Sequence, residues 1–174
     1  MVNLSEKFLI DANTLMAAAR LYYAYDILPA FWSVFFFFIK EGNVILLDMV
    51  KNEIDKGQDE LQEWVKERQD DFVDCNHVDP EIIPKYADVM QYIQGCGLYN
   101  QKGLDSWAKN DIADTWLIAT AMAKGYTLIT FEQSAGQLSL KNKSGKVKIP
   151  DVANHFGVRV HNLYYMMRQL GIRI

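Results

Sequence analysis

Four acidic side chains stand where short apolar segments end or where a helix begins, and they are the residues best suited to chemistry. They are Asp11, Glu53, Asp114 and Glu132. If the apolar segments form parallel strands, groups at their carboxyl ends converge on one crevice of the sheet. Four carboxylates in one crevice repel each other unless a cation neutralises them. The expected cation is a hard divalent ion, Mg²⁺ or Mn²⁺, held by oxygen ligands.

The segments that must position these acids alternate between two kinds. Short apolar runs predict strands at residues 7–10, 44–47, 127–131, 147–149 and 158–160. Helices are predicted at residues 13–21, 49–56, 59–71 and 163–170, and others begin at Pro29, Pro80, Asp114 and Asp151. The glycine-containing segment 95–109 is expected to be irregular and to line a substrate groove. This alternation predicts an α/β fold, a three-layer α/β/α sandwich with a mainly parallel central sheet.

The helix that begins at Pro29 is apolar on every face from Phe31 to Ile39. A helix of this kind must be buried on all sides. It can lie between the sheet and neighbouring helices, which is the interpretation we favour. A second subunit can instead cover part of it, and the pattern is therefore compatible with a homodimer.

Length and composition predict one domain that spans residues 1–174 and has a sizeable core. Half of the residues are apolar, which argues against disorder. Cys75 and Cys96 lack metal-ligand spacing, and we see no signal-peptide pattern, so free thiols in a reducing cytoplasm are expected. The longest apolar run, residues 27–39, is too short to span a bilayer, and no membrane association is expected.

The formal net charge of −4 is unusual for a protein that binds nucleic acid. The four candidate acids alone carry this charge, and a bound divalent ion would cancel it and attract phosphate. A basic cluster follows Glu132 in the sequence and consists of Lys141, Lys143, Lys146 and Lys148. Two interpretations stay open for it: it guides a phosphate backbone to the site, or it is a solvated turn.

Several ordered segments resemble the PIN-like nuclease domains. They are Ile10-Asp11-Ala12-Asn13-Thr14-Leu15, Val50-Lys51-Asn52-Glu53-Ile54, Ala113-Asp114-Thr115-Trp116-Leu117-Ile118-Ala119-Thr120-Ala121 and Leu128-Ile129-Thr130-Phe131-Glu132. The resemblance is strongest to a prokaryotic PIN-like subfamily, the domain of unknown function DUF4411, through Tyr22-Tyr23, Pro29-Ala30-Phe31-Trp32 and Lys148-Ile149-Pro150-Asp151. One departure from the wider PIN pattern is Glu132, because an Asp usually occupies the fourth acidic position. A longer carboxylate still binds metal, but the coordination geometry differs.

The resemblance implies a divalent-metal-dependent endoribonuclease that hydrolyses RNA phosphodiester bonds. By similarity to PIN-domain toxins, it also implies the toxin half of a prokaryotic toxin–antitoxin pair, with an antitoxin protein as partner. Mg²⁺ or Mn²⁺ would activate water and polarise the scissile phosphate. Asp11 and Asp114 would be direct ligands, and Glu53 and Glu132 would complete the set directly or through water.

The two strongest candidates also have structural interpretations. Asp11 can cap the helix that follows it. Asp111 can cap the next helical segment, with Asp114 completing a capping pair in the first turn. The family resemblance favours Asp114 and leaves Asp111 as a secondary candidate.

The remaining candidates are open to a structural interpretation as well. Glu53 lies among charged residues and can belong to a solvated helix face, and Glu132 can be a simple loop acid. Asp151 follows Pro150 and is expected to be an N-cap with a structural role. Asn13 and Thr130 lie beside the proposed ligands, where they can orient carboxylates or bound water, or they can be turn residues.

Two other functions compete with the nuclease. A PIN-like module without catalysis could bind RNA or support assembly, although all four acidic positions are filled. Asp11-Ala12-Asn13-Thr14-Leu15 also resembles the nucleophile loop of haloacid-dehalogenase-like phosphatases. That loop needs a second acid where Asn13 stands, so the general acid would be missing.

Overall fold

The computed structural model describes residues 6–109 and 112–174. Its sheet has four parallel strands in the order β2-β1-β3-β4, namely β1 (Phe8–Ile10), β2 (Val44–Ile45), β3 (Thr127–Ile129) and β4 (Val160–His161). Leu9 pairs with Ile45 on one side and with Leu128 on the other. All four strands therefore present their carboxyl ends at the same edge.

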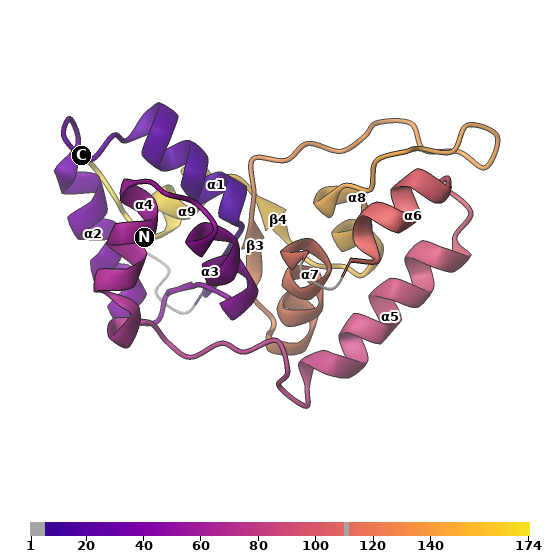
Figure 1. The fold of residues 1–174 in the computed structure, drawn as a ribbon, viewed down its shortest axis with the longest axis horizontal. Coiled ribbons are helices and arrows are strands. Elements are labelled where there is room, and N and C mark those ends of the chain that lie inside the picture. Colours follow the sequence, from indigo (N-terminus) through magenta and orange to yellow (C-terminus); the bar gives the residue numbers. More distant parts are fainter. Residues whose placement is uncertain (1–5, 110–111) are drawn as a thin grey trace.

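Helices cover both faces of this sheet. They are α1 (Ala12–Ala17), the π-helix η1 (Ala18–Tyr22), α2 (Pro29–Lys40), α3 (Asp48–Asp55), α4 (Glu60–Glu67), the 3₁₀-helix η2 (Gln69–Asp71), α5 (Ile82–Gly95), α6 (Gln101–Trp107), α7 (Ala113–Lys124), α8 (Ile149–His155) and α9 (Leu163–Gln169). Figure 1 shows α1, α2 and α9 on one side of the strands and α5, α7 and α8 on the other. The three-layer α/β/α sandwich predicted from the sequence is confirmed.

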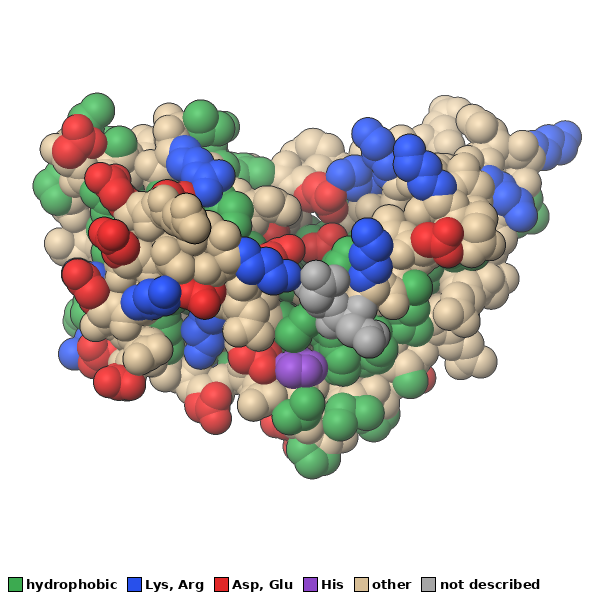
Figure 2. Space-filling view, viewed as in Figure 1, with side chains coloured by type: hydrophobic (Ala, Val, Ile, Leu, Met, Phe, Trp, Pro, Cys, Tyr) green, Lys and Arg blue, Asp and Glu red, His purple; other side chains and the backbone are tan. Residues whose placement is uncertain are grey.

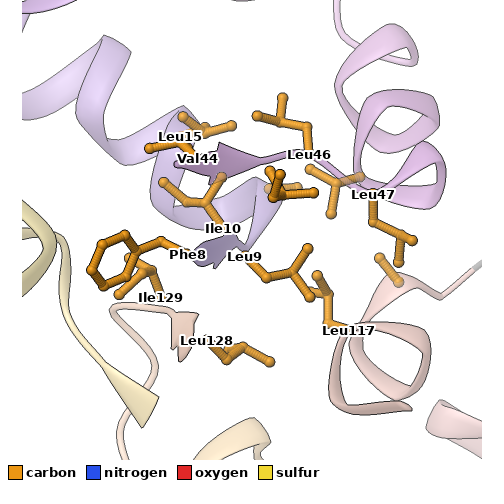
Figure 3. Close-up of a cluster of buried hydrophobic side chains, with 14 of the residues drawn as sticks. Phe8, Leu9, Ile10, Leu15, Val44, Leu46, Leu47, Leu117, Leu128 and Ile129 are labelled. Atoms are coloured by element: carbon orange, nitrogen blue, oxygen red, sulfur yellow. The ribbon is translucent and has the colours of Figure 1, made fainter. Parts of the chain in front are cut away.

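The core is built on the alternation of side chains along fully apolar strands. Figure 3 shows Leu9 and Leu128 directed toward Leu117 of α7, whereas Phe8 and Ile10 point to the opposite side. On that side the Phe8 ring meets the edge of Tyr165 from α9 at a centroid distance of 6.4 Å. Both faces of β1 are buried, which is why its sequence has no polar alternation.

Several expected boundaries are wrong, and local structure explains two of them. Residues 147–149 do not form a strand, because α8 begins at Ile149 and places Pro150 in its first turn. Segment 95–109 is not irregular throughout, since Asn100 accepts a hydrogen bond from the Gly103 N–H and caps α6. Strand β3 ends at Ile129, and the last strand lies at Val160–His161 instead of 158–160.

The helix at Pro29 forms as expected, but its burial is incomplete. Phe31 and Phe35 are fully buried, while Phe37 is 55% exposed. The expectation of burial on every face is therefore wrong for Phe37. Within the described residues, no helix has the length and apolar character needed to cross a membrane.

Candidate active site at the carboxyl edge of the sheet

Asp11 stands directly after β1 and is both an N-cap and a buried carboxylate. Its side chain accepts hydrogen bonds from the Asn13 N–H at 3.0 Å, Thr14 Oγ1 at 3.3 Å and Thr130 Oγ1 at 2.9 Å. The residue is only 3% exposed, and burial raises the pKa of this carboxyl, although the three hydrogen bonds act in the opposite direction. The capping and site interpretations of Asp11 are thus compatible.

Two threonines join the β1–α1 turn to the segment that follows β3. The Thr130 hydroxyl donates to Asp11 and accepts from the Glu132 N–H at 3.0 Å. The Thr14 hydroxyl donates to Asp11 and accepts from the Phe131 N–H at 2.9 Å. These bonds fix one Asp11 oxygen and end the strand pairing. Sequence reasoning missed Thr14. The only feature of the sequence that could have indicated Thr14 is a hydroxyl side chain three residues after an N-cap.

The Asn13 side chain takes no part in this network. The Asn13 side chain is exposed, and its contact with Asp11 comes from the backbone N–H. Asp111 lies outside the described residues. The residue at the N-cap of α7 is Ile112, which has no side chain able to cap.

Asp114 lies in the first turn of α7 and brings the four acids into one electrostatic group. The pKa of Asp114 is raised to about 7, chiefly by burial and also by the negative charges of Asp11, Glu132 and Glu53. The positive charge of Lys148 has the opposite effect. Asp11, Glu132 and Glu53 are therefore close enough to Asp114 for their charges to act on its carboxyl.

Glu132 is held by two partners from the start of α8. Its Oε1 lies 2.5 Å from Lys148 Nζ, and its Oε2 accepts from the Ile149 N–H at 2.7 Å. The Glu132 and Lys148 side chains are only 26% and 29% exposed. Glu132 is therefore not a free loop acid, because both of its oxygens connect the β3 end to α8.

The basic cluster divides into two parts. Lys148 faces the acids, whereas Lys141, Lys143 and Lys146 are exposed on the long connection before α8. Ser144 anchors that connection, because its N–H donates to the Leu98 carbonyl and its own carbonyl accepts from the Asn100 N–H, both at 2.9 Å. The Ser144 backbone thus lies beside the start of α6.

Glu53 and Asp151 occupy different surroundings. Glu53 lies on α3, is partly exposed, and contributes to the field at Asp114. The expected N-cap role of Asp151 is wrong, because α8 starts two residues earlier. Its carboxylate instead accepts from the Ser134 hydroxyl and from the Ala135 N–H, the latter at 2.9 Å. Asp151 thereby ties the connection after β3 to α8.

Acidic side chains gather in a hollow at the centre of the molecule, as Figure 2 shows, with Lys and Arg side chains beside it on both sides. Carboxylate oxygens are suitable donors for Mg²⁺ or Mn²⁺. Within residues 6–109 and 112–174, however, no three Asp, Glu, His or Cys side chains are placed to share one ion. Glu132 points to Lys148, so the side chains supply the donors and the charge without a closed set of ligands.

A family comparison identifies the chain. The model of the family described as "Domain of unknown function (DUF4411)" matches residues 8–174. The chain belongs to the DUF4411 family. The family resemblance expected from the sequence is confirmed, and it extends over nearly all of the chain.

Solved structures place this DUF4411 protein in the PIN-like fold. VapBC2 from Rickettsia felis, crystallised with a DNA fragment from its promoter, is 11% identical with a TM-score of 0.51, covering 89% of this chain and 97% of that one. FitAcB from Neisseria gonorrhoeae is 17% identical with a TM-score of 0.51, covering 91% and 99% respectively. Both are PIN-domain toxin–antitoxin complexes. A comparison with curated proteins finds no significant match.

Proposed function

We propose that this DUF4411 protein is a divalent-metal-dependent ribonuclease that cleaves RNA phosphodiester bonds. The observation that supports this most strongly is the grouping of Asp11, Glu53 and Glu132 near the buried Asp114 carboxyl, whose pKa their negative charges raise in addition to burial. A protein gains no stability from four acids at one edge of a sheet, and such crowding is typical of functional sites. The PIN-like fold is consistent with the proposal.

In this proposal Asp11 and Asp114 would hold the ion directly, and Glu53 would reach it through water. Bound Mg²⁺ or Mn²⁺ would supply an activated water and polarise the phosphate. Thr14 and Thr130 would fix the orientation of the Asp11 carboxylate through their hydroxyl hydrogen bonds. Glu132 completes the acidic set and positions the Lys148 ammonium, whose charge favours a phosphate group at the same edge.

We also propose that the protein is the toxin component of a toxin–antitoxin pair. The similar solved structures are complexes of that kind, VapBC2 and FitAcB. In this arrangement the partner is a small antitoxin protein that covers the acidic hollow. Growth arrest on expression of the chain, lost with Asp11→Asn, would support this role.

A second candidate function is an RNA-binding or assembly module without catalysis. The observation in its favour is the ion pair of Lys148 with Glu132, because an internal ammonium can neutralise the acids in place of a metal. This alternative predicts RNA binding in EDTA and no cleavage in any metal.

The deciding experiment is cleavage of labelled tRNA and single-stranded RNA by purified protein, with Mg²⁺, Mn²⁺ or EDTA. Asp114→Asn is the test variant. Asp88→Asn is the matched control, since Asp88 lies on α5 in an exposed pair with Lys85. Metal-dependent cleavage that persists in Asp88→Asn and disappears in Asp114→Asn supports the nuclease. Equal cleavage by all three proteins indicates another nuclease in the sample, and RNA binding without cleavage supports the module.

A further inference from the structure

Three aromatic rings from separate segments meet beside the acidic site. We call Tyr22, Phe131 and Tyr164 the aromatic platform. The centroids of Tyr22 and Phe131 lie 5.4 Å apart, those of Phe131 and Tyr164 6.0 Å apart, and those of Tyr22 and Tyr164 6.4 Å apart. Tyr22 is 46% exposed and Tyr164 is 37% exposed. The rings contact each other but keep a large part of their surface open to solvent.

The Tyr22-Tyr23 pair is divided between the core and this surface. Tyr23 stacks on Phe31 at 4.0 Å with nearly parallel rings, and its hydroxyl donates to Met167 Sδ at 3.4 Å. Tyr22 instead ends the π-helix η1, in which the Tyr23 N–H donates to the Ala18 carbonyl. A π-helical turn is rare and often occurs at functional positions. Here it turns Tyr22 outward while Tyr23 remains packed.

One ring of the aromatic platform belongs to a residue that lies between two residues of the acidic site in the sequence. Phe131 lies between Thr130, which donates to Asp11, and Glu132, which binds Lys148. Neighbouring Cα atoms are about 3.8 Å apart, so the Phe131 backbone is within one residue of both. Its N–H is also bonded to Thr14, whose hydroxyl reaches Asp11. The platform therefore borders the acids at the same edge of the sheet, on the side where α1 and α9 lie (Figure 1).

We infer that the aromatic platform stacks an unpaired base of a single-stranded nucleic acid whose phosphate lies at the acidic site. The inference rests on the proposed function and assigns to the platform a base-stacking role in binding the RNA. A strand with one phosphate at the acids carries its adjoining bases to the border of the site, where the three rings lie. Stacking on aromatic rings accepts any base, because every base has a π face. A duplex hides those faces inside its own stack, so it cannot use the platform.

The test measures binding in Ca²⁺, a hard divalent ion that gives the acids a cation to attract phosphate, and a gel checks that the probe stays intact. The probes are a single-stranded RNA of mixed sequence and a hairpin duplex of equal charge, titrated against the wild type, Tyr22→Ala and Tyr164→Ala. Both variants should bind the single strand about five- to a hundredfold more weakly, the effect of losing one base–aromatic stack. Tyr22→Phe and Tyr164→Phe keep the ring and should retain wild-type affinity. Phe37→Ala removes an exposed ring on α2 and is the matched control.

A second measurement uses the unaltered protein, so it does not depend on the folding of a variant. A single-stranded RNA that carries 2-aminopurine near the middle of its sequence should lose fluorescence on binding, because stacking quenches this base. The inference is overturned if the fluorescence does not change or if the Ala variants bind the single strand with wild-type affinity. It is equally overturned if their affinities for the single strand and for the hairpin fall by the same factor. It is also overturned if the Ala variants no longer bind a coexpressed protein partner but bind RNA as tightly as the wild type. Absence of metal-dependent cleavage with intact stacking would contradict only the proposed nuclease.

Discussion

Lys148 Nζ lies 2.5 Å from Glu132 Oε1, so an ammonium group from the start of α8 is paired within the acidic site. The pair connects the segment after β3 to α8, and the Ile149 N–H strengthens this connection through the second Glu132 oxygen. Lys148 also counteracts the rise in the pKa of Asp114. A metal ion and Lys148 are therefore expected to compete for the same negative charge.

We expect Lys148→Met to bind Mn²⁺ more tightly than the wild type, because it removes the competing cation. Without metal it should be less stable by about 1–3 kcal/mol, the effect of leaving a partly buried carboxylate without its charged donor. Calorimetric titration with Mn²⁺ and urea unfolding in EDTA measure the two effects. Lys85→Met is the control, since its exposed pair with Asp88 contributes about 1 kcal/mol or less. Similar behaviour of both variants would contradict the competition.

Compared with the wild type, Asp114→Asn should stabilise the metal-free protein more at pH 8 than at pH 5. The folded-state pKa of Asp114 is about 7, above its ordinary value near 3.8, so the folded state binds more protons between these pH values. The contribution of Asp114 to stability therefore falls as the pH rises from about 4 to about 7. Asn cannot ionise, so the gain at pH 8 over pH 5 should be at most about 3 kcal/mol.

Urea unfolding in EDTA at the two pH values checks this prediction. Asp88→Asn, an exposed substitution on α5, should change stability by no more than about 0.5 kcal/mol. If Asp114→Asn and the wild type show the same pH dependence, the acids do not act on Asp114 as the structure indicates. Mn²⁺ at pH 8 should stabilise the wild type more than the variant, because the variant has one charge fewer to neutralise.

Thr14→Val should destabilise the protein by about 1–3 kcal/mol, since it leaves the Phe131 N–H without its acceptor and Asp11 without a donor. Thr120→Val is the matched control. The Thr120 hydroxyl is buried without a hydrogen-bond partner, so its replacement by a methyl group should be neutral or stabilising. Chemical unfolding measures both, and an equal loss in the two variants would contradict a specific role for the Thr14 hydrogen bonds.

The exposed lysines of the connection before α8 should act through charge alone. Replacing Lys141, Lys143 and Lys146 with Gln should weaken RNA binding similarly for all sequences. The slope of log affinity against log salt should fall by about 0.7 for each lost contact with a single-stranded phosphate backbone. Binding titrations at several salt concentrations measure the slope. An unchanged slope would assign these lysines to a solvated turn.

The sequence alone determined the architecture and the region of the site. Apolar runs such as 8–10 and 127–129 are too short for a helix and indicate buried strands, and strands that alternate with helices indicate parallel connections. Parallel strands end at one edge, so the positions of Asp11 and Glu132 at strand ends were sufficient to predict that they approach each other. These conclusions depend on local periodicity and on chain connectivity, both of which can be read from the order of the residues.

Tertiary structure decided which groups hold those acids. The hydrogen bond from Thr130 to Asp11 joins residues 119 positions apart, and that from Phe131 to Thr14 joins residues 117 positions apart. The Lys148–Glu132 pair depends on α8 beginning at Ile149, where the sequence pattern had indicated a strand. The meeting of Tyr22, Phe131 and Tyr164 requires three segments to pack together. Side-chain partners of this kind depend on packing geometry, which the periodicity of a single segment does not encode.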